Sequence, residues 1–146
     1  MKTCIVYYSK HHGNTKKLVE AIADRNDVTL IDVTTTPSAD LTAFDRIGFA
    51  SGIYFSSFSK QILKFASDCL PEGKEVFFIN TCGNPLGMYF DAIRKITEKK
   101  NCRELGHYQC LGFDTFGPFK LVGGIAKGHP TNEEIEGAVK FYESLS

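Results

Sequence analysis

The sequence has no tryptophan, no excess of either charge and no long apolar run. Its 17 Lys and Arg residues balance 17 Asp and Glu residues, and a neutral chain is poorly suited to the phosphate backbone of nucleic acid. No apolar run approaches the roughly 18 to 20 residues that a membrane-spanning helix needs. No apolar leader segment follows Met1. We therefore expect a cytoplasmic protein that binds no nucleic acid and does not insert into a membrane.

The cysteines do not show the spacing of a metal site or of a dithiol catalyst. The chain has five, Cys4, Cys69, Cys82, Cys102 and Cys110, and no two of them form a C-x-x-C pair. We expect reduced thiols that pack as small apolar side chains, and no bound metal.

The composition is typical of a folded domain, with 42% hydrophobic and 23% charged residues among 146. A chain of this length buries enough surface to fold without a disulfide or a metal. No internal repeat or linker interrupts it. We predict a single domain over residues 1–146 and favour a monomer.

Short apolar runs alternate with segments of helical period. Strands are predicted at Ile5–Tyr8, Val28–Val33, Arg46–Ala50, Glu75–Asn80 and Glu104–Gly112, the last at an edge. Apolar residues recur at helical spacing in four groups: Leu18, Val19, Ile22 and Ala23; Phe58, Ile62, Phe65, Ala66 and Cys69; Tyr89, Ala92, Ile93 and Ile96; Ile135, Ala138, Val139 and Tyr142. The last group follows a capping box at Thr131–Glu134. The alternation predicts an α/β fold with a doubly wound, five-stranded parallel sheet, strand order 2-1-3-4-5, and helices on both faces.

Ligands of such sheets bind outside the carboxyl ends of the strands, which selects the loops after strands one, three and four. In the first loop, Ser9, Asn14 and Thr15 offer side-chain donors, and Gly13 allows close approach of the backbone. The helix that follows begins with free N–H groups. This combination favours a bound phosphate over an ordinary capped turn.

The absence of several motifs restricts further which ligand the first loop can bind. The chain has no G-x-x-x-x-G-K-[ST] motif for a triphosphate and no G-x-G-x-x-G motif for a dinucleotide. Strands one and three do not end in the carboxylate of a phospho-receiver domain, and no cysteine precedes an arginine at phosphatase spacing. The first loop therefore suits a single phosphate group.

The other two loops offer groups that could contact a flat heterocycle. With no tryptophan present, stacking falls to Tyr54 or Phe55 in the second loop, whereas Phe58 is expected in the core. The third loop, Thr81–Pro85, supplies backbone amides, a hydroxyl and a carboxamide that could bind the edge of a ring.

These residues resemble the flavodoxin family. The segment Ser9–Thr15 is similar to its phosphate loop, [ST]-x-[ST]-G-N-T, with Gly13-Asn14-Thr15 retained and His12 where a hydroxyl is usual. The segment Cys110–Phe119, with Gly123-Gly124 and Gly128–Pro130, resembles the C-terminal part of short flavodoxin-like proteins. The likeness extends from Thr3 to about Tyr142 and implies a flavodoxin-like fold.

The resemblance implies a non-covalently bound FMN that does the redox chemistry, with no side chain acting as acid, base or nucleophile. Its phosphate would be held by Ser9, His11, His12, Gly13, Asn14 and Thr15. Its isoalloxazine would be flanked by Ser51, Gly52, Ile53, Tyr54 and Phe55, and by Thr81, Cys82, Gly83 and Asn84. From the residues alone, the two histidines could equally be solvated loop side chains.

The implied function is electron transfer between a reductase and acceptor proteins. The alternative is an FMN-dependent NAD(P)H:quinone or flavin reductase, which needs an additional substrate pocket and usually a dimer. A chain of 146 residues has little room for such a pocket, and this favours the carrier. A third reading, a module that has lost its flavin, is disfavoured by the retained Gly13-Asn14-Thr15.

The charge balance makes a testable prediction. Flavodoxins are typically strongly acidic, and their negative charge opposes formation of the anionic reduced flavin, whereas this chain is neutral. We expect a less negative reduction potential than that of an acidic flavodoxin, and partner docking that depends less on salt. A redox titration that gives a strongly negative potential would contradict this expectation.

Overall fold

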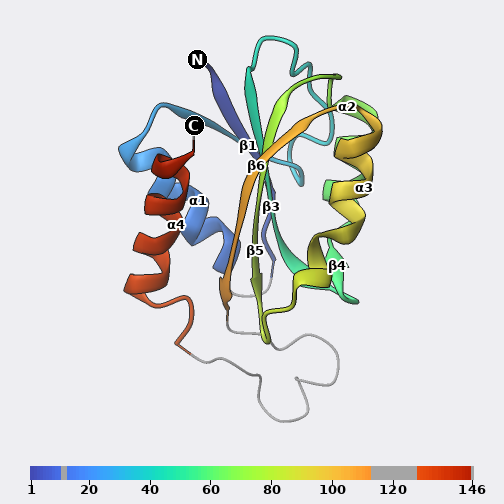
Figure 1. The fold of residues 1–146 in the computed structure, drawn as a ribbon. Coiled ribbons are helices and arrows are strands. Elements are labelled where there is room, and N and C mark those ends of the chain that lie inside the picture. The colour runs from blue at the N-terminus through green and yellow to red at the C-terminus, as the bar shows by residue number, and fades with distance from the viewer. Residues whose placement is uncertain (11–12, 113–127, 146) are drawn as a thin grey trace.

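A computed structural model describes residues 1–10, 13–112 and 128–145. It consists of a central sheet with helices packed on both sides (Figure 1). In chain order the elements are β1 (Thr3–Tyr8), α1 (Asn14–Arg25), β2 (Val28–Asp32), β3 (Arg46–Tyr54), β4 (Ser57–Phe58), α2 (Lys60–Cys69), β5 (Glu75–Cys82), the 3₁₀ helix η1 (Gly87–Phe90), α3 (Asp91–Lys99), β6 (Arg103–Leu111) and α4 (Asn132–Ser144).

The sheet has the predicted topology. Five strands pair in parallel in the order β2-β1-β3-β5-β6, which is 2-1-3-4-5 when the parallel strands are counted along the chain. As predicted, β6 lies at an edge. The short strand β4 is an addition, and it pairs antiparallel with the end of β3.

Two apolar cores lie on opposite faces of the sheet, because successive residues of a strand point to opposite sides. Val6 and Phe49 belong to the core that α2 and α3 cover. Ile5 and Ile79 belong to the core that α1 and α4 cover. Helices on both faces bury every residue of β1, which explains its uninterrupted apolar run. Among the described residues, no helix is long and apolar enough to cross a membrane.

Parallel pairing aligns the carboxyl ends of the central strands at one edge of the sheet, the lower edge in Figure 1. Tyr8 at the end of β1 pairs with Ser51 of β3, and Gly52 pairs with Thr81 of β5. The segments that follow β1, β3 and β5 therefore leave the sheet at the same edge.

The third strand is longer than predicted. It was expected to end at Ala50 with a loop after it, but β3 continues to Tyr54. The extension has its own partner, since β4 folds back and pairs Ile53 with Phe58 and Tyr54 with Ser57. Placing Phe58 in a helical stripe was therefore wrong, although it is a buried core residue, as expected.

Two helices begin later than the spacing of apolar residues predicted. Helix α2 begins at Lys60, because the Ser59 side-chain oxygen caps it and accepts a hydrogen bond from the Ile62 N–H at 3.2 Å. Tyr89 lies in η1, ahead of α3, which begins at Asp91. Apart from β3, the predicted strands begin and end within two residues of the observed ones.

The start of α4 is tied to the end of β6. The predicted capping box is confirmed: the Thr131 hydroxyl accepts from the Glu134 N–H, and the Thr131 N–H donates to the Glu134 carboxylate at 2.8 Å. The same carboxylate accepts from the Leu111 N–H at 3.2 Å and contacts the His129 ring. One side chain thus joins the first turn of α4 to the last residue of β6.

Glu134 makes stability depend on pH. Burial alone would raise the pKa of this carboxyl, but hydrogen bonds from Thr131, His129 and Leu111 outweigh burial and lower it. A lowered pKa in the folded state stabilises the protein above the unfolded pKa, and that stabilisation is lost as pH falls below about 4.5. We expect Glu134→Gln to lower the free energy of unfolding by about 1 kcal/mol at pH 7.

The measurement is urea unfolding of the wild type and the Glu134→Gln variant between pH 7 and pH 3. The two stabilities should converge at the acid end. Glu133→Gln is the matched control, because the Glu133 side chain forms no hydrogen bond or ion pair with any residue that the structure describes. A constant difference across the pH range would contradict the prediction.

Candidate functional site

The first of the three segments at the carboxyl edge begins α1. Gly13 precedes the helix with φ of 64°, a left-handed conformation that glycine adopts without steric cost. Gly13, the N-cap residue, has no side chain to cap the helix, and a Cβ placed there would meet no atom of the described residues within 4 Å. Among the described residues, nothing covers Gly13, and the positive end of the helix dipole is directed toward it.

Ser9 holds the chain just before this helix. Its hydroxyl accepts a hydrogen bond from the Lys16 N–H in the first turn of α1 at 3.1 Å. The hydroxyl proton itself can still be donated to a ligand. His11 and His12, predicted phosphate contacts, lie outside the described residues.

Asn14 and Thr15 lie in the interior, and both are buried. The Thr15 hydroxyl lies 2.9 Å from the Thr81 hydroxyl, so α1 is linked to the end of β5. Asn14 packs against the chain just after β6, where a Cβ at Gly112 would come within 2.7 Å of its amide nitrogen. Of the two threonine hydroxyls only one donates to the other, which leaves one proton for a ligand.

The second segment is a tight hairpin, not the loop expected from sequence. Ser51, Gly52, Ile53 and Tyr54 lie in β3. The Ser51 hydroxyl is used within the fold, where it accepts from the Ser59 N–H at 2.9 Å and donates to the Gly52 carbonyl. It therefore fastens the hairpin to the start of α2.

Phe55 and Ser56 form the two-residue turn of this hairpin, with φ of 51° and 63°. Both values belong to the left-handed region, which costs a non-glycine residue about 1–2 kcal/mol. Phe55 is also 86% exposed, although exposing a large apolar side chain is unfavourable. Strain and exposure at one turn are typical of a binding element.

Tyr54 points away from the tip of the hairpin toward the end of β1. Its ring meets the ring of Tyr8 edge to face, with centroids 5.7 Å apart. Sequence reasoning missed Tyr8. Its position as the last residue of the first strand was the signal that could have found it, since strand ends form the site in such sheets.

In the third segment, Thr81 and Cys82 are the last residues of β5 and are buried, whereas Asn84 is exposed. The Cys82 thiol donates to the Cys110 carbonyl at 3.6 Å. Burial raises the pKa of the Cys110 thiol to about 12, so it remains a thiol at neutral pH and is no nucleophile. Gly83 continues the chain between Cys82 and Asn84, half-buried.

Two further apolar side chains that sequence reasoning missed follow this segment. Leu86 is 42% exposed and Met88 is 54% exposed, and η1, which holds Met88, packs against β4. The hairpin and the chain after β5 are thus neighbours with exposed apolar side chains.

A family model described as a flavodoxin domain matches residues 5–84, more than half of the chain. The chain belongs to the flavodoxin family. It is 35% identical over 147 aligned positions to the uncharacterized protein MJ0298 of Methanocaldococcus jannaschii, with 99% of this chain and 98% of that protein covered.

Solved flavodoxins share the fold of this member of the family. Oxidised flavodoxin 1 of Bacillus cereus has a TM-score of 0.71 at 15% identity, with both chains covered completely. The flavodoxin of Streptococcus pneumoniae TIGR4 has a TM-score of 0.68 at 17% identity, covering 99% of this chain and 97% of that one. A flavoprotein of Lactobacillus acidophilus solved with FMN has a TM-score of 0.56 at 20% identity, covering 74% and 92%.

The strain in the hairpin can be tested with one substitution. Ser56→Gly removes the left-handed penalty at φ of 63° and adds only the smaller entropic cost of glycine, so we expect about 0.5–1 kcal/mol of added stability. Ser57→Gly, one residue later in β4, should instead be neutral or destabilising. Urea unfolding of both variants measures this, and a less stable Ser56→Gly protein would contradict it.

Proposed function

We propose that this flavodoxin-family protein binds FMN and carries electrons between a reductase and acceptor proteins. The observation that supports FMN most directly is the start of α1. There, a helix whose N-cap residue is a glycine, a Gly13 position that no described residue covers, and a spare threonine proton lie together at the carboxyl edge of the sheet. These features suit a terminal phosphate, which is stabilised by free helix N–H groups.

We assign the phosphate to Ser9, His11, His12, Gly13, Asn14 and Thr15. In this arrangement Gly13 and the first turn of α1 supply backbone donors, and Ser9 and one of the paired threonines supply hydroxyl protons. Asn14 and Thr15 also position the start of α1. Asn14 contacts the chain just after β6, and Thr15 contacts the end of β5.

We place the flavin ring between residues 51–55 of the hairpin and residues 81–84 at the end of β5. The hairpin offers aromatic surface at Tyr54 and Phe55, and stacking on such surface contributes about 0.5–1.5 kcal/mol beyond area burial. The exposure of Phe55 supports this, because a bound ring would cover it. FMN, when bound, supplies one-electron or two-electron transfer, and the side chains bind and orient it.

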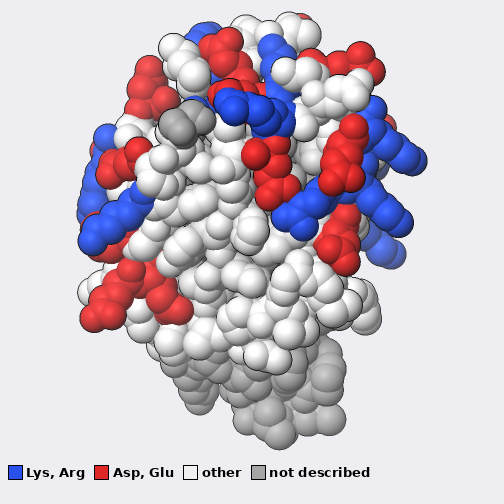
Figure 2. All heavy atoms as spheres, in the orientation of Figure 1, with Lys and Arg blue, Asp and Glu red and all other residues white. Residues whose placement is uncertain are grey.

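Apolar contacts are the proposed basis of partner docking. Phe55, Leu86 and Met88 expose apolar surface near the proposed flavin site. On the face shown in Figure 2, the charged side chains lie over the upper part and the flanks, and the described surface lower down is uncharged. A redox partner that docks through Phe55, Leu86 and Met88 gains mainly from apolar contact, so docking should depend weakly on salt.

The first test is the visible spectrum of the purified protein before and after addition of FMN, followed by stepwise reduction. Stoichiometric flavin bands that reduce reversibly would support the proposal, and absence of FMN binding would overturn it. Steady-state oxidation of NAD(P)H by the purified protein, with a quinone or free flavin as acceptor, would instead support the reductase alternative.

A glycine pair tests the assigned phosphate site. Gly13→Ala forces an alanine into φ of 64° without a steric clash, so only the backbone at the start of α1 is affected. We expect FMN affinity to fall by up to about tenfold as the chain relaxes from the binding conformation. The measurement is an FMN titration followed by flavin fluorescence.

Gly73→Ala is the matched control. Gly73 has φ of 74°, and a Cβ there also meets nothing within 4 Å, but it lies in the turn before β5, at the opposite edge of the sheet. It carries the same backbone strain and should leave FMN affinity unchanged. If both substitutions lowered FMN affinity equally, Gly13 would not be part of the phosphate site.

A further inference from the structure

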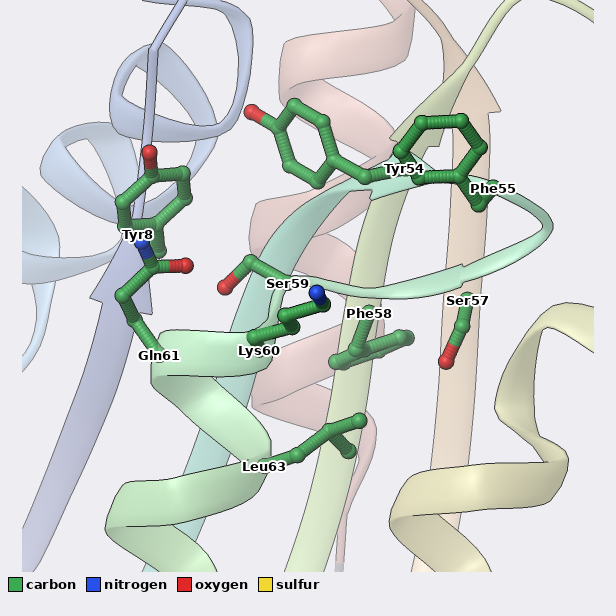
Figure 3. A pocket seen from close by; sticks show the side chains of 9 residues that line it. All are labelled: Tyr8, Tyr54, Phe55, Ser57, Phe58, Ser59, Lys60, Gln61 and Leu63. Atoms are coloured by element: carbon green, nitrogen blue, oxygen red, sulfur yellow. The ribbon is translucent and has the colours of Figure 1, made fainter.

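A cavity of about 460 Å³ lies on the side of the β3–β4 hairpin that faces α2 (Figure 3). Its lining comes from the end of β1, the hairpin and the first turns of α2. Residues 13–15 and 81–84, two of the three segments assigned to FMN, contribute nothing to it. The cavity is therefore separate from most of the proposed cofactor site, with Tyr54 and Phe55 shared between them.

The walls of the cavity are mainly aromatic. Tyr8 and Tyr54 form one side, and the buried Phe58 and the half-buried Leu63 form the other (Figure 3). The volume is in the range of small-molecule sites, which are concave and mostly apolar with a few polar groups. Aromatic side chains on both sides favour a flat, unsaturated ligand.

One polar group in the lining has no partner. The Ser57 hydroxyl oxygen is buried and forms no hydrogen bond with the part of the chain that the structure describes, and Ser57 lines the cavity. A buried hydroxyl without a hydrogen bond costs about 1–3 kcal/mol. This oxygen is buried, so the cost belongs to the fold, and the ligand's charged group is selected elsewhere in the lining.

The entrance of the cavity is positively charged. Lys60 is exposed, lines the cavity and forms no ion pair with any residue that the structure describes. The N–H groups of Lys60 and Gln61, in the first turn of α2, are likewise without acceptors, because the Ser59 cap accepts from the Ile62 and Leu63 N–H groups. None of the described residues that line the cavity carries a carboxylate. These groups together favour an anion.

We propose that this cavity binds a planar aromatic carboxylate, a ligand of one or two fused rings with a single carboxylate group. The rings lie between Tyr8 and Tyr54 on one side and Phe58 and Leu63 on the other. The carboxylate lies at the start of α2, where Lys60 and the free N–H groups bind it. The proposal does not depend on FMN binding.

The probe is 2-naphthoate, titrated by calorimetry into the full chain with and without saturating FMN. We expect saturable one-to-one binding in both conditions. Lys60→Gln should weaken it about tenfold, as loss of a charge-assisted contact does, and the neutral analogue 2-naphthamide should bind the wild type correspondingly more weakly.

Lys64→Gln is the matched control. It makes the same charge change one turn along α2, but Lys64 pairs with Asp68 at 2.7 Å and does not line the cavity. It should bind 2-naphthoate like the wild type. Absence of saturable binding, or equal affinities of the Lys60→Gln and Lys64→Gln variants, would overturn the proposal.

Stoichiometric displacement of 2-naphthoate by FMN would also overturn it, because the cavity would then be part of the flavin site. If the chain binds no FMN, the titration of the flavin-free protein still decides the question. Failure of the proposed cofactor and failure of this second site therefore give different results.

Discussion

Parallel pairing of the buried strands is the constraint on which the rest of the structure depends. Because β1, β3 and β5 pair in register, Tyr8, Ser51 and Thr81 reach the same edge of the sheet from distant parts of the sequence. The Thr15 hydroxyl in the first turn of α1 reaches the Thr81 hydroxyl because β1, which leads into α1, and β5 end at the same edge of the sheet. Apolar cores on both faces stabilise this pairing, so the edge is a rigid base for its loops.

The β3–β4 hairpin is the place at the carboxyl edge of the sheet where parallel strand pairing ends. β3 is longer than its parallel neighbours, and its last two residues, Ile53 and Tyr54, pair with β4 instead. The turn brings Phe55 into solvent at the expense of backbone strain. It also separates two environments, with the proposed flavin site on the side of β5 and the cavity on the side of α2 (Figure 3).

The features that were predicted correctly depend on local signals. The apolar run of β1 and the Thr131–Glu134 capping box are readable within a few residues. The features that were missed depend on partners elsewhere in the fold. The extension of β3 exists because β4 returns to pair with it, and no periodicity within 46–54 reports that pairing.

The same distinction applies to the candidate site. The sequence by itself determined which three segments lie at the carboxyl edge, since strand order follows from the alternation of strands and helices. Only the tertiary structure decided what each side chain does there. Thr15 and Ser51 use their hydroxyls within the fold, and Tyr8 joins Tyr54 at the cavity. Residue type specifies which hydrogen bonds a side chain can form, but packing against distant strands determines which of them it forms.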